Sequence, residues 1–212
     1  MKQKYFIDTH KGATPLFIIF LISYFNQWNN YVALMYLALH GTYGILWIAK
    51  SNIFPDSQWE GKISIFYGLY IWMGLSLYWV SPYLIVSHLD ILPFSIKVSP
   101  KYLCFCLVLF ILGVFLHFTS DMQKYIYLKL KPGNLIKNGM FKKIRNTNYL
   151  GELFIYLGFS LLATDWFPII CLFLIILIVW VPNMIKKDKS LARYPDFKEY
   201  KKKSSIIFPP FL

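Results

Sequence analysis

Four polar side chains recur at every fourth position between residues 148 and 160, where most of the intervening residues are apolar. They are Asn148, Glu152, Tyr156 and Ser160. Residues four apart lie on one face of a helix, so this spacing predicts a helix with a single polar face. A carboxylate is costly to bury without a partner. We therefore expect this face to point into the protein and to bind a polar ligand.

Two other stretches show a similar spacing. His117, Asp121 and Tyr125 follow one another at intervals of four, and Lys124 comes one helical turn after Asp121. A second set, with intervals of three or four, consists of Tyr36, His40, Tyr43 and Trp47. Such side chains can move protons or bind a ligand. They can also join helices by hydrogen bonds, and Asp121 can simply neutralise Lys124, so both interpretations stay open.

Basic residues flank the segment that carries Asn148 and Glu152. Seven Lys and Arg residues and no acidic residue lie between Lys124 and Arg145, and a second basic group follows residue 185. These cations can bind anionic lipid headgroups, each contributing about 1 kcal/mol. They can equally meet the phosphates of a cofactor while carboxylate and carboxamide groups hold its rings and riboses. The sequence therefore predicts a polar cavity with a cationic rim.

The composition indicates what kind of protein must position these groups. The chain has 212 residues, of which 57% are hydrophobic, and its long uncharged stretches are residues 12–49, 63–89, 102–120 and 166–185. This pattern excludes a soluble enzyme and a disordered chain. The net charge of +12 would suit a nucleic-acid-binding protein. However, the basic residues lie in short segments between uncharged stretches, so no nucleic acid is expected as a partner.

The three cysteines Cys104, Cys106 and Cys171 all lie inside apolar stretches. Their spacing fits neither a disulfide framework nor a metal site, so no metal is expected.

The uncharged stretches predict an all-α integral membrane protein with six transmembrane helices. The expected spans are Thr14 to Phe25, Tyr31 to Ala49, Ile63 to Val86, Tyr102 to Phe118, a short fifth helix beginning near Asn148, and Trp166 to Val181. The break Thr164-Asp165-Trp166 predicts that the last two helices form a short hairpin. Residues 1–116 would then face the substrate, and residues 117–212 would face the cofactor.

The distribution of basic residues predicts the orientation. With six spans, all but two of the 22 Lys and Arg residues fall on one side, the exceptions being Lys97 and Lys101. The positive-inside rule then places both termini in the cytoplasm. Because Asp8 and Lys11 precede a short first span, no cleavable signal peptide is expected. The endoplasmic reticulum, the bacterial inner membrane and the mitochondrial inner membrane all remain possible locations.

Several short motifs lie between residues 117 and 212. They are Ser120-Asp121, Lys131-Pro132-Gly133, Gly139-Met140-Phe141, Asn148-Tyr149-Leu150-Gly151-Glu152, Tyr194-Pro195 and Phe208-Pro209-Pro210-Phe211. Together they resemble the C-terminal half of the steroid 5α-reductase family, to which the DUF1295 membrane reductases are related. The Asn-Tyr-Leu-Gly-Glu motif, about thirty residues after Ser-Asp, is the most specific of them.

The resemblance implies an NADPH-dependent membrane reductase of a carbon–carbon double bond conjugated to a carbonyl, in a steroid or another apolar lipid. The positions that match the family's cofactor pocket are Asp121, Asn148, Tyr149 and Glu152. Looser matches for phosphate or adenine-ribose contacts are Lys124, Arg145, Lys187 and Tyr194. Tyr43, helped by His40, falls roughly where the family carries a His-Tyr element, and it is the expected donor to the substrate carbonyl.

A departure from the family's pattern and a second resemblance keep other functions open. The family has a membrane-embedded Glu near its N-terminus, whereas the first two expected spans contain no acidic residue. The stretch from Arg145 to Tyr149 also resembles the Arg-His-Pro-x-Tyr element of membrane methyltransferases that act on isoprenylcysteine or phospholipid amines with S-adenosylmethionine, but it lacks the His-Pro pair. A third possibility is an inactive accessory subunit of a larger membrane complex that retains the fold.

Overall fold

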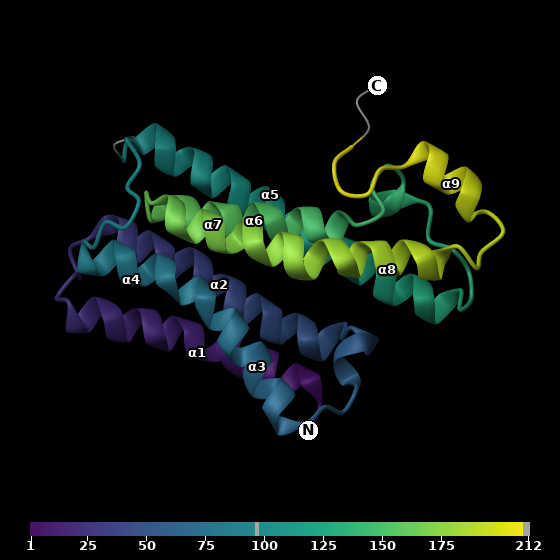
Figure 1. The fold of residues 1–212 in the computed structure, drawn as a ribbon, viewed down its shortest axis with the longest axis horizontal. Coiled ribbons are helices and arrows are strands. Elements are labelled where there is room, and N and C mark those ends of the chain that lie inside the picture. The colour runs from purple at the N-terminus through teal and green to yellow at the C-terminus, as the bar shows by residue number, and fades with distance from the viewer. Residues whose placement is uncertain (96–97, 210–212) are drawn as a thin grey trace. The chain divides into compact units, whose positions relative to one another are not determined.

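The computed structural model of the chain describes residues 1–95 and 98–209 (Figure 1). Within these ranges every regular element is helical, which confirms the all-α class. The α-helices are α1 (Gln3–Tyr24), α2 (Tyr31–Ile53), α3 (Ile65–Ser76), α4 (Val80–Ser87), α5 (Pro100–Leu130), α6 (Thr147–Leu162), α7 (Trp166–Ile175), α8 (Val181–Leu191) and α9 (Phe197–Lys203). A π-helical turn, Ile176–Trp180, joins α7 to α8.

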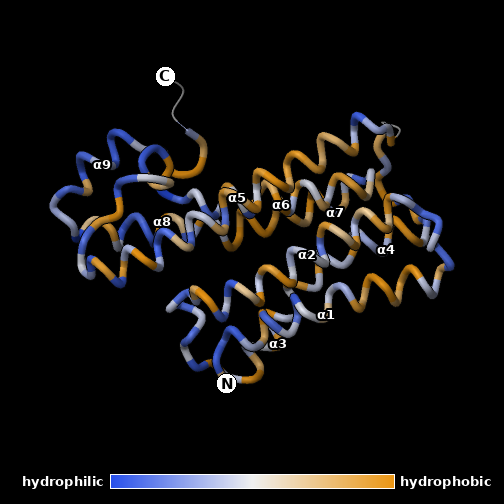
Figure 2. Tube along the Cα trace, turned by 180° about the vertical axis from the view of Figure 1, so that it is seen from behind, coloured by the Kyte–Doolittle hydropathy of each residue, from blue (hydrophilic) through white to orange (hydrophobic). Residues whose placement is uncertain are grey.

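Four helical segments of the described chain are long and apolar enough to cross a membrane. They are Tyr31–Ile53, Ile65–Ser87, Pro100–Leu130 and Trp166–Leu191. Figure 2 shows the apolar residues running along α5 and α7, whereas α9 is largely hydrophilic. The chain is therefore a membrane-embedded protein. Six spans and cytoplasmic termini remain predictions, and Lys97, which entered the charge count, lies outside the described residues.

Several helices extend beyond the uncharged stretches from which they were predicted. α1 begins at Gln3 rather than Thr14, and α5 continues to Leu130 rather than ending at Phe118. A helix continues through charged residues until a cap or a turn stops it, whereas the sequence prediction followed only the uncharged core. As a result Asp8 and Lys11 lie inside α1. The first helix therefore does contain an acidic residue, and the Asp8 Oδ2 accepts a hydrogen bond of 2.7 Å from the Ser51 hydroxyl.

The chain divides into two compact units that interleave along the sequence. The N-terminal unit consists of Met1–Phe110 and Tyr156–Leu172, and the C-terminal unit consists of Ile111–Ile155 and Phe173–Leu212. Helices α5, α6 and α7 each contribute residues to both units. The functional division between residues 1–116 and 117–212 stays a prediction.

In the N-terminal unit, α1 and α2 approach each other closely at a glycine. A Cβ atom placed on Gly44 would lie 2.5 Å from the Lys11 carbonyl oxygen, so only glycine permits this contact. The loop between the two helices ends at Asn30, whose side chain accepts hydrogen bonds from the backbone amides of Val32 and Ala33 and so caps α2. This packing brings Lys11 to the side of α2.

A buried acid organises the predicted connection between α6 and α7. The Asp165 Oδ2 accepts hydrogen bonds from the backbone amides of Ile91 and Leu92, at 2.9 and 2.8 Å. Its Oδ1 accepts a third bond, of 2.7 Å, from the amide of Phe167 in the first turn of α7. Asp165 is 1% exposed, and these three bonds give it a structural role in the N-terminal unit.

In the C-terminal unit, α5 and α6 meet backbone to backbone. A Cβ atom on Gly151 would lie 2.4 Å from the His117 amide nitrogen, and one on Gly113 would lie 2.7 Å from the Gly151 carbonyl oxygen. Small residues are what allow two helices to pack this closely in a membrane protein. The contact places His117 directly beside the first turns of α6.

Candidate functional site

A buried histidine lies between two carboxylates in the C-terminal unit. His117 is 1% exposed, and its Nε2 lies 3.7 Å from the Asp121 Oδ2. Its Nδ1 lies 3.3 Å from the backbone carbonyl of Asn148 and 4.0 Å from the Glu152 Oε1. We call His117, Asp121, Asn148 and Glu152 the carboxylate cluster. Three of the predicted cofactor residues are therefore brought together around a histidine that the prediction had left without a role.

The Asn148 side chain supplies the observation that bears most directly on a ligand. Its Oδ1 is buried and has no hydrogen-bond partner among the residues that the structure describes. An unsatisfied buried acceptor costs about 1–3 kcal/mol, so such an atom calls for an explanation. The neighbouring Glu152 side chain remains 15% exposed. This acceptor set fits a ligand that donates hydrogen bonds, such as the carboxamide and ribose hydroxyls of a nicotinamide nucleotide.

Two other predicted residues lie on the same helices. The half-buried Tyr149 ring lies next to Trp180, with ring centres 5.4 Å apart, so it packs toward the turn between α7 and α8. Lys124 is half-buried on α5, one turn after Asp121. Both positions are compatible with contacts to a ligand at the carboxylate cluster.

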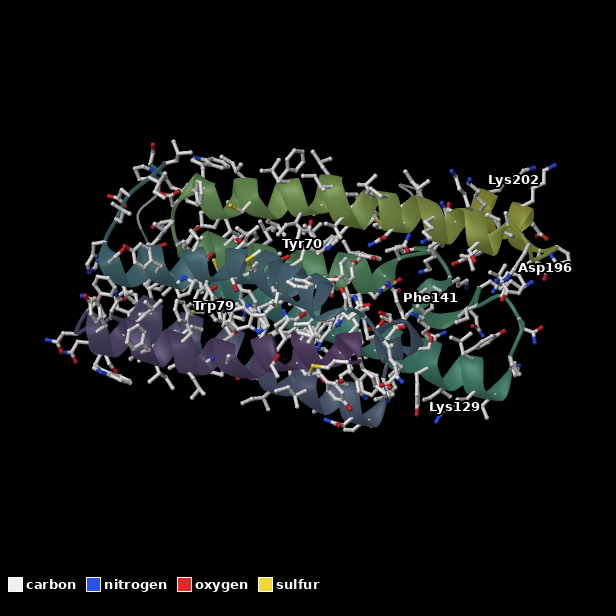
Figure 3. All side chains as sticks on the ribbon, turned by 60° about the horizontal axis from the view of Figure 1, so that its bottom comes forward. Tyr70, Trp79, Lys129, Phe141, Asp196 and Lys202 are labelled. Carbon is white, nitrogen blue, oxygen red and sulfur yellow. The ribbon has the colours of Figure 1, made fainter. Side chains whose placement is uncertain are left out.

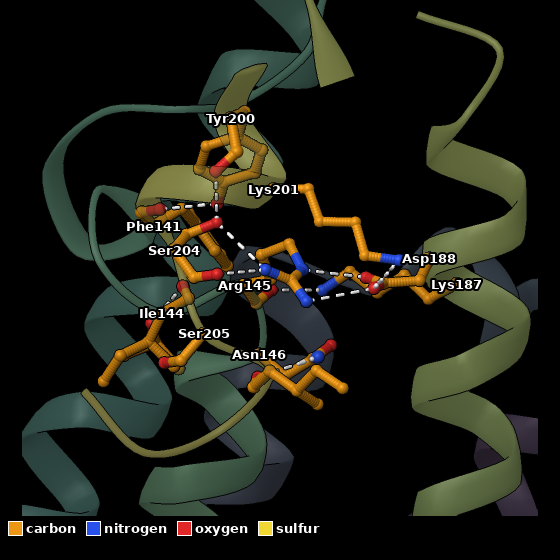
Figure 4. A network of polar contacts seen from close by, with 12 residues as sticks. Phe141, Ile144, Arg145, Asn146, Lys187, Asp188, Tyr200, Lys201, Ser204 and Ser205 are labelled. Atoms are coloured by element: carbon orange, nitrogen blue, oxygen red, sulfur yellow. Dashed lines mark hydrogen bonds and ion pairs between the residues drawn. The ribbon is translucent and has the colours of Figure 1, made fainter. Parts of the chain in front are cut away.

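Arg145 is the centre of a second polar group, shown in Figure 4. Its Nε and Nη2 donate to the two carboxylate oxygens of Asp188 on α8, at 2.9 and 3.0 Å. Its Nη1 donates to the Ser204 carbonyl and to the Ser204 hydroxyl. Lys187 donates to the Arg145 carbonyl oxygen at 2.8 Å. We call Arg145, Lys187, Asp188, Tyr200 and Ser204 the tail network.

The tail network fixes the chain immediately before α6. The amides of Arg145 and Ser205 bond to the carbonyls of Ser205 and Lys143, each at 2.9 Å. The Tyr200 hydroxyl donates to the Phe141 carbonyl at 2.5 Å, and burial raises the pKa of Tyr200 to about 12. All three guanidinium nitrogens of Arg145 bond to groups of the chain itself, so the geometry gives this arginine a structural role. Its contact with a phosphate stays a prediction.

Tyr194 lies in a third setting within the C-terminal unit. It packs against an apolar cluster formed by Leu135, Phe197 and Tyr200, and its hydroxyl accepts a hydrogen bond of 3.1 Å from Arg193. Lys129, Asp196 and Lys202, which also belong to this unit, carry exposed charges that project from its helices and loops (Figure 3). The predicted cofactor residues therefore fall into separate groups, of which the carboxylate cluster holds the acid and amide side chains.

The predicted catalytic pair lies in the N-terminal unit. His40 and Tyr43 are both fully buried on α2. The His40 Nδ1 lies 3.0 Å from the Tyr36 hydroxyl, and its ring stacks on Phe159. The Tyr43 hydroxyl lies 3.3 Å from the Tyr156 hydroxyl. The two predicted residues thus belong to one buried polar region, but the Tyr43 hydroxyl is paired with Tyr156 from α6, whereas His40 is paired with Tyr36.

Lys11 is the residue in this region that the sequence prediction missed. Its Nζ donates to the Tyr156 hydroxyl at 3.0 Å, and the residue is 1% exposed. Four aromatic rings lie within 6 Å of this nitrogen, those of Tyr43, Trp47, Tyr78 and Tyr156. We call Lys11, Tyr43 and Tyr156 the hydroxyl cluster. The sequence prediction placed Lys11 just before a short first span, because nothing in the local sequence links this residue to Tyr156.

A pocket lies in the same unit, beside α1, α2 and the turn Ser57–Glu60. Its lining includes Asp8, Trp47 and Lys50. Glu60, which also lines the pocket, pairs with Lys2 and Lys4 near the start of α1. Trp47 is common to this pocket and to the ring of aromatic residues around Lys11.

Comparison with known proteins gives one match. The sequence model of the DUF1295 family, described as a protein of unknown function, matches residues 53–204, well over half of the chain. No curated protein and no solved structure matches. The matched range contains the carboxylate cluster, the tail network and Tyr156, whereas Lys11, His40 and Tyr43 precede it. The chain therefore belongs to the DUF1295 family, which is related to steroid 5α-reductase-like proteins.

Proposed function

We propose that this protein is an NADPH-dependent membrane reductase of the carbon–carbon double bond in an apolar lipid or steroid enone. Membership of the DUF1295 family supports this proposal. The observation that carries it is the Asn148 Oδ1, a buried acceptor without a described partner, next to the half-buried Glu152 and the buried Asp121.

The cofactor is held by the C-terminal unit. Asn148, Glu152 and Asp121 accept hydrogen bonds from the nucleotide's amide and hydroxyl groups, and Tyr149 packs beside them. Lys124 and Lys187 provide positive charge for the phosphates. Arg145 keeps α8 and the chain's tail in place, and Tyr194 contributes to the adenine-ribose end.

The substrate carbonyl is bound in the N-terminal unit. When bound, NADPH supplies a hydride to the β-carbon of the enone. Tyr43 donates a hydrogen bond to the carbonyl oxygen, where negative charge collects as the double-bond electrons move toward it. His40 holds the Tyr36 hydroxyl and the neighbouring aromatic side chains in position. The α-carbon of the resulting enolate then takes up a proton from solvent, which gives the saturated carbonyl compound.

The proposal includes a membrane topology of six spans with both termini in the cytoplasm. This arrangement also places most of the basic residues on the cytoplasmic side, where they contact anionic lipid headgroups. An apolar substrate enters from the lipid phase, and the soluble cofactor enters from the cytoplasm.

The proposal is tested by thermal unfolding of the detergent-solubilised protein with NADPH or S-adenosylmethionine, followed by an assay of NADPH oxidation with steroid and lipid enones. A ligand that binds only the native state raises the unfolding temperature. Stabilisation by NADPH, with enone-dependent oxidation, supports the reductase. Stabilisation by S-adenosylmethionine alone would identify a methyltransferase, and no effect of either ligand would favour an accessory subunit.

A further inference from the structure

The start of the chain fixes the walls of the pocket beside α1, α2 and the turn Ser57–Glu60. The Met1 carbonyl accepts a hydrogen bond of 2.9 Å from the Ile63 amide, and the Gln3 amide donates to the Gly61 carbonyl at 3.0 Å. These bonds join the first residues of α1 to the segment that follows the turn. The empty volume of the pocket, counted to its open mouth, is about 280 Å³. This lies below the roughly 300–1,000 Å³ of sites for drug-sized ligands, so only a small group fits.

Asp8 lines this pocket with an acceptor that the chain does not use. Its Oδ2 accepts the hydrogen bond from Ser51, whereas its Oδ1 is buried and has no hydrogen-bond partner among the residues that the structure describes. Lys4 lies one helical turn before Asp8 and lines the same pocket, but its Nζ pairs with Glu60. A buried carboxylate oxygen without a donor is unfavourable. The Asp8 Oδ1 therefore calls for a donor from outside the chain.

The other groups of the pocket favour a donor that carries positive charge. Three carboxylates and two lysines line it, namely Asp8, Asp56 and Glu60 against Lys4 and Lys50. The indole ring of Trp59 also lines the pocket, and aromatic faces attract cations. An excess of carboxylates beside an aromatic wall is typical of a site for a small organic cation.

The need for an N–H donor decides which cation fits. A quaternary ammonium group has no N–H bond, so it cannot satisfy the Asp8 Oδ1. Among the described residues, no group of three or more His, Cys, Asp and Glu side chains is placed to hold a metal ion. A primary ammonium group has both the charge and three donors. We infer that this pocket binds a primary ammonium group, with Asp8 as its acceptor and Trp59 as its aromatic wall.

The level of the pocket in the membrane indicates where such a group comes from. Trp47 and Lys50, which line the pocket, lie near the end of the candidate span Tyr31–Ile53. The end of a span lies at the level of the lipid headgroups. The headgroup of phosphatidylethanolamine ends in a primary ammonium group, and a free amine such as ethanolamine brings the same group from the aqueous phase. Neither source involves NADPH, so the inference does not rest on the proposed reductase activity.

Thermal unfolding of the detergent-solubilised protein tests the site, since a ligand that binds only the native state raises the unfolding temperature. The probes are ethanolamine, choline, and the short-chain dihexanoyl forms of phosphatidylethanolamine and phosphatidylcholine. We expect stabilisation by the two primary ammonium compounds and none by their trimethylated counterparts. The affinity, taken from the concentration dependence of the shift, should be about 10-fold lower in Asp8→Asn. It should be about threefold lower in Trp59→Leu.

The matched control is Asp90→Asn, which removes an exposed carboxylate of the same unit and should bind as the wild type does. Tighter binding of phosphatidylethanolamine than of ethanolamine supports a lipid ligand, and equal affinities support a free amine. The inference is overturned if no primary ammonium compound stabilises the wild type, if the trimethylated compounds stabilise it equally, or if Asp8→Asn and Asp90→Asn behave alike. Should Asp8→Asn not fold, Trp59→Leu and the comparison of ethanolamine with choline decide the question.

Discussion

Arg145 and Asp188 are joined by two parallel hydrogen bonds, from Nε to Oδ1 at 2.9 Å and from Nη2 to Oδ2 at 3.0 Å. Both side chains are largely buried, with 3% and 12% of their surfaces exposed. Bidentate pairs of this kind fix geometry as well as adding energy. Because the same guanidinium also holds Ser204, the pair ties α8 and the C-terminal tail to the residues immediately before α6.

Asp188→Ala should therefore destabilise the protein strongly. It leaves the buried Arg145 charge without its carboxylate, and breaking a buried pair from one side costs about 3–5 kcal/mol. The free energy of unfolding in mixed micelles measures the loss. The control is Asp196→Ala, which removes an exposed carboxylate paired with Lys137 and should cost less than about 1 kcal/mol. Equal losses in the two variants would show that the buried pair of Arg145 and Asp188 contributes no more to stability than an exposed ion pair does.

Gly151→Ala should disrupt the contact between α5 and α6. The added methyl group would lie 2.4 Å from the His117 amide nitrogen, and backbone cannot move aside as a flexible side chain can. We expect a loss of about 1–3 kcal/mol in the free energy of unfolding. Gly74→Ala is the control, since a Cβ there meets no atom within 4 Å, and it should be neutral or stabilising by up to about 1 kcal/mol. A neutral Gly151→Ala would contradict the described helix contact.

The raised pKa of Tyr200 predicts a loss of stability in alkaline solution. Burial raises its pKa from 10 in its ordinary state to about 12 in the folded protein, so the folded state retains a proton that the unfolded state has lost between these values. This contribution to stability is complete below pH 10 and is lost as the pH rises toward 12, at about 1.4 kcal/mol per pH unit. The free energy of unfolding, measured from pH 9 to 12, should fall less steeply with pH in Tyr200→Phe than in the wild-type protein. Identical slopes in the two proteins would contradict this prediction.

The topology prediction can be checked within the N-terminal unit. In a background lacking the three native cysteines, Asn29→Cys lies in the loop between α1 and α2, and Gln58→Cys lies in the turn after α2; both positions are exposed. If α2 spans the membrane with the N-terminus in the cytoplasm, a membrane-impermeant thiol reagent added outside should label Asn29→Cys in intact cells. Gln58→Cys should react only after lysis. Labelling of both from one side would exclude this arrangement.

Helical class and several helix ends follow from local sequence. Residues 26–30, the gap between the first two expected spans, do separate α1 from α2, and the break around Asp165 does separate α6 from α7. Helix lengths were underestimated, because charged residues can continue a helix beyond its apolar core. Lys11 shows the consequence: excluded from the expected first span, it lies inside α1 and is buried.

The candidate site was predictable only in part, because some of its contacts join residues that lie far apart in the sequence. The four-residue spacing of Asn148 and Glu152, and of His117 and Asp121, identified two helix faces, and the structure brings them together in one cluster. The bond between Lys11 and Tyr156 joins residues 145 positions apart, and no periodicity within one helix can indicate such a pair. The role of Arg145 depends likewise on Asp188 and Ser204, which lie far along the chain.

The affinity of the purified protein for NADPH, measured for Asn148→Ala and Glu152→Gln, tests the central claim most directly. Each change removes an acceptor of the carboxylate cluster, and hydrogen bonds to bound ligands of this kind contribute about 0.5–3 kcal/mol. We expect each variant to bind at least 10-fold more weakly than the wild type while its unfolding temperature without ligand stays close to the wild-type value. The exposed replacements Asn134→Ala and Glu199→Gln should bind NADPH normally. Wild-type affinity in both Asn148→Ala and Glu152→Gln would contradict a cofactor site at this cluster.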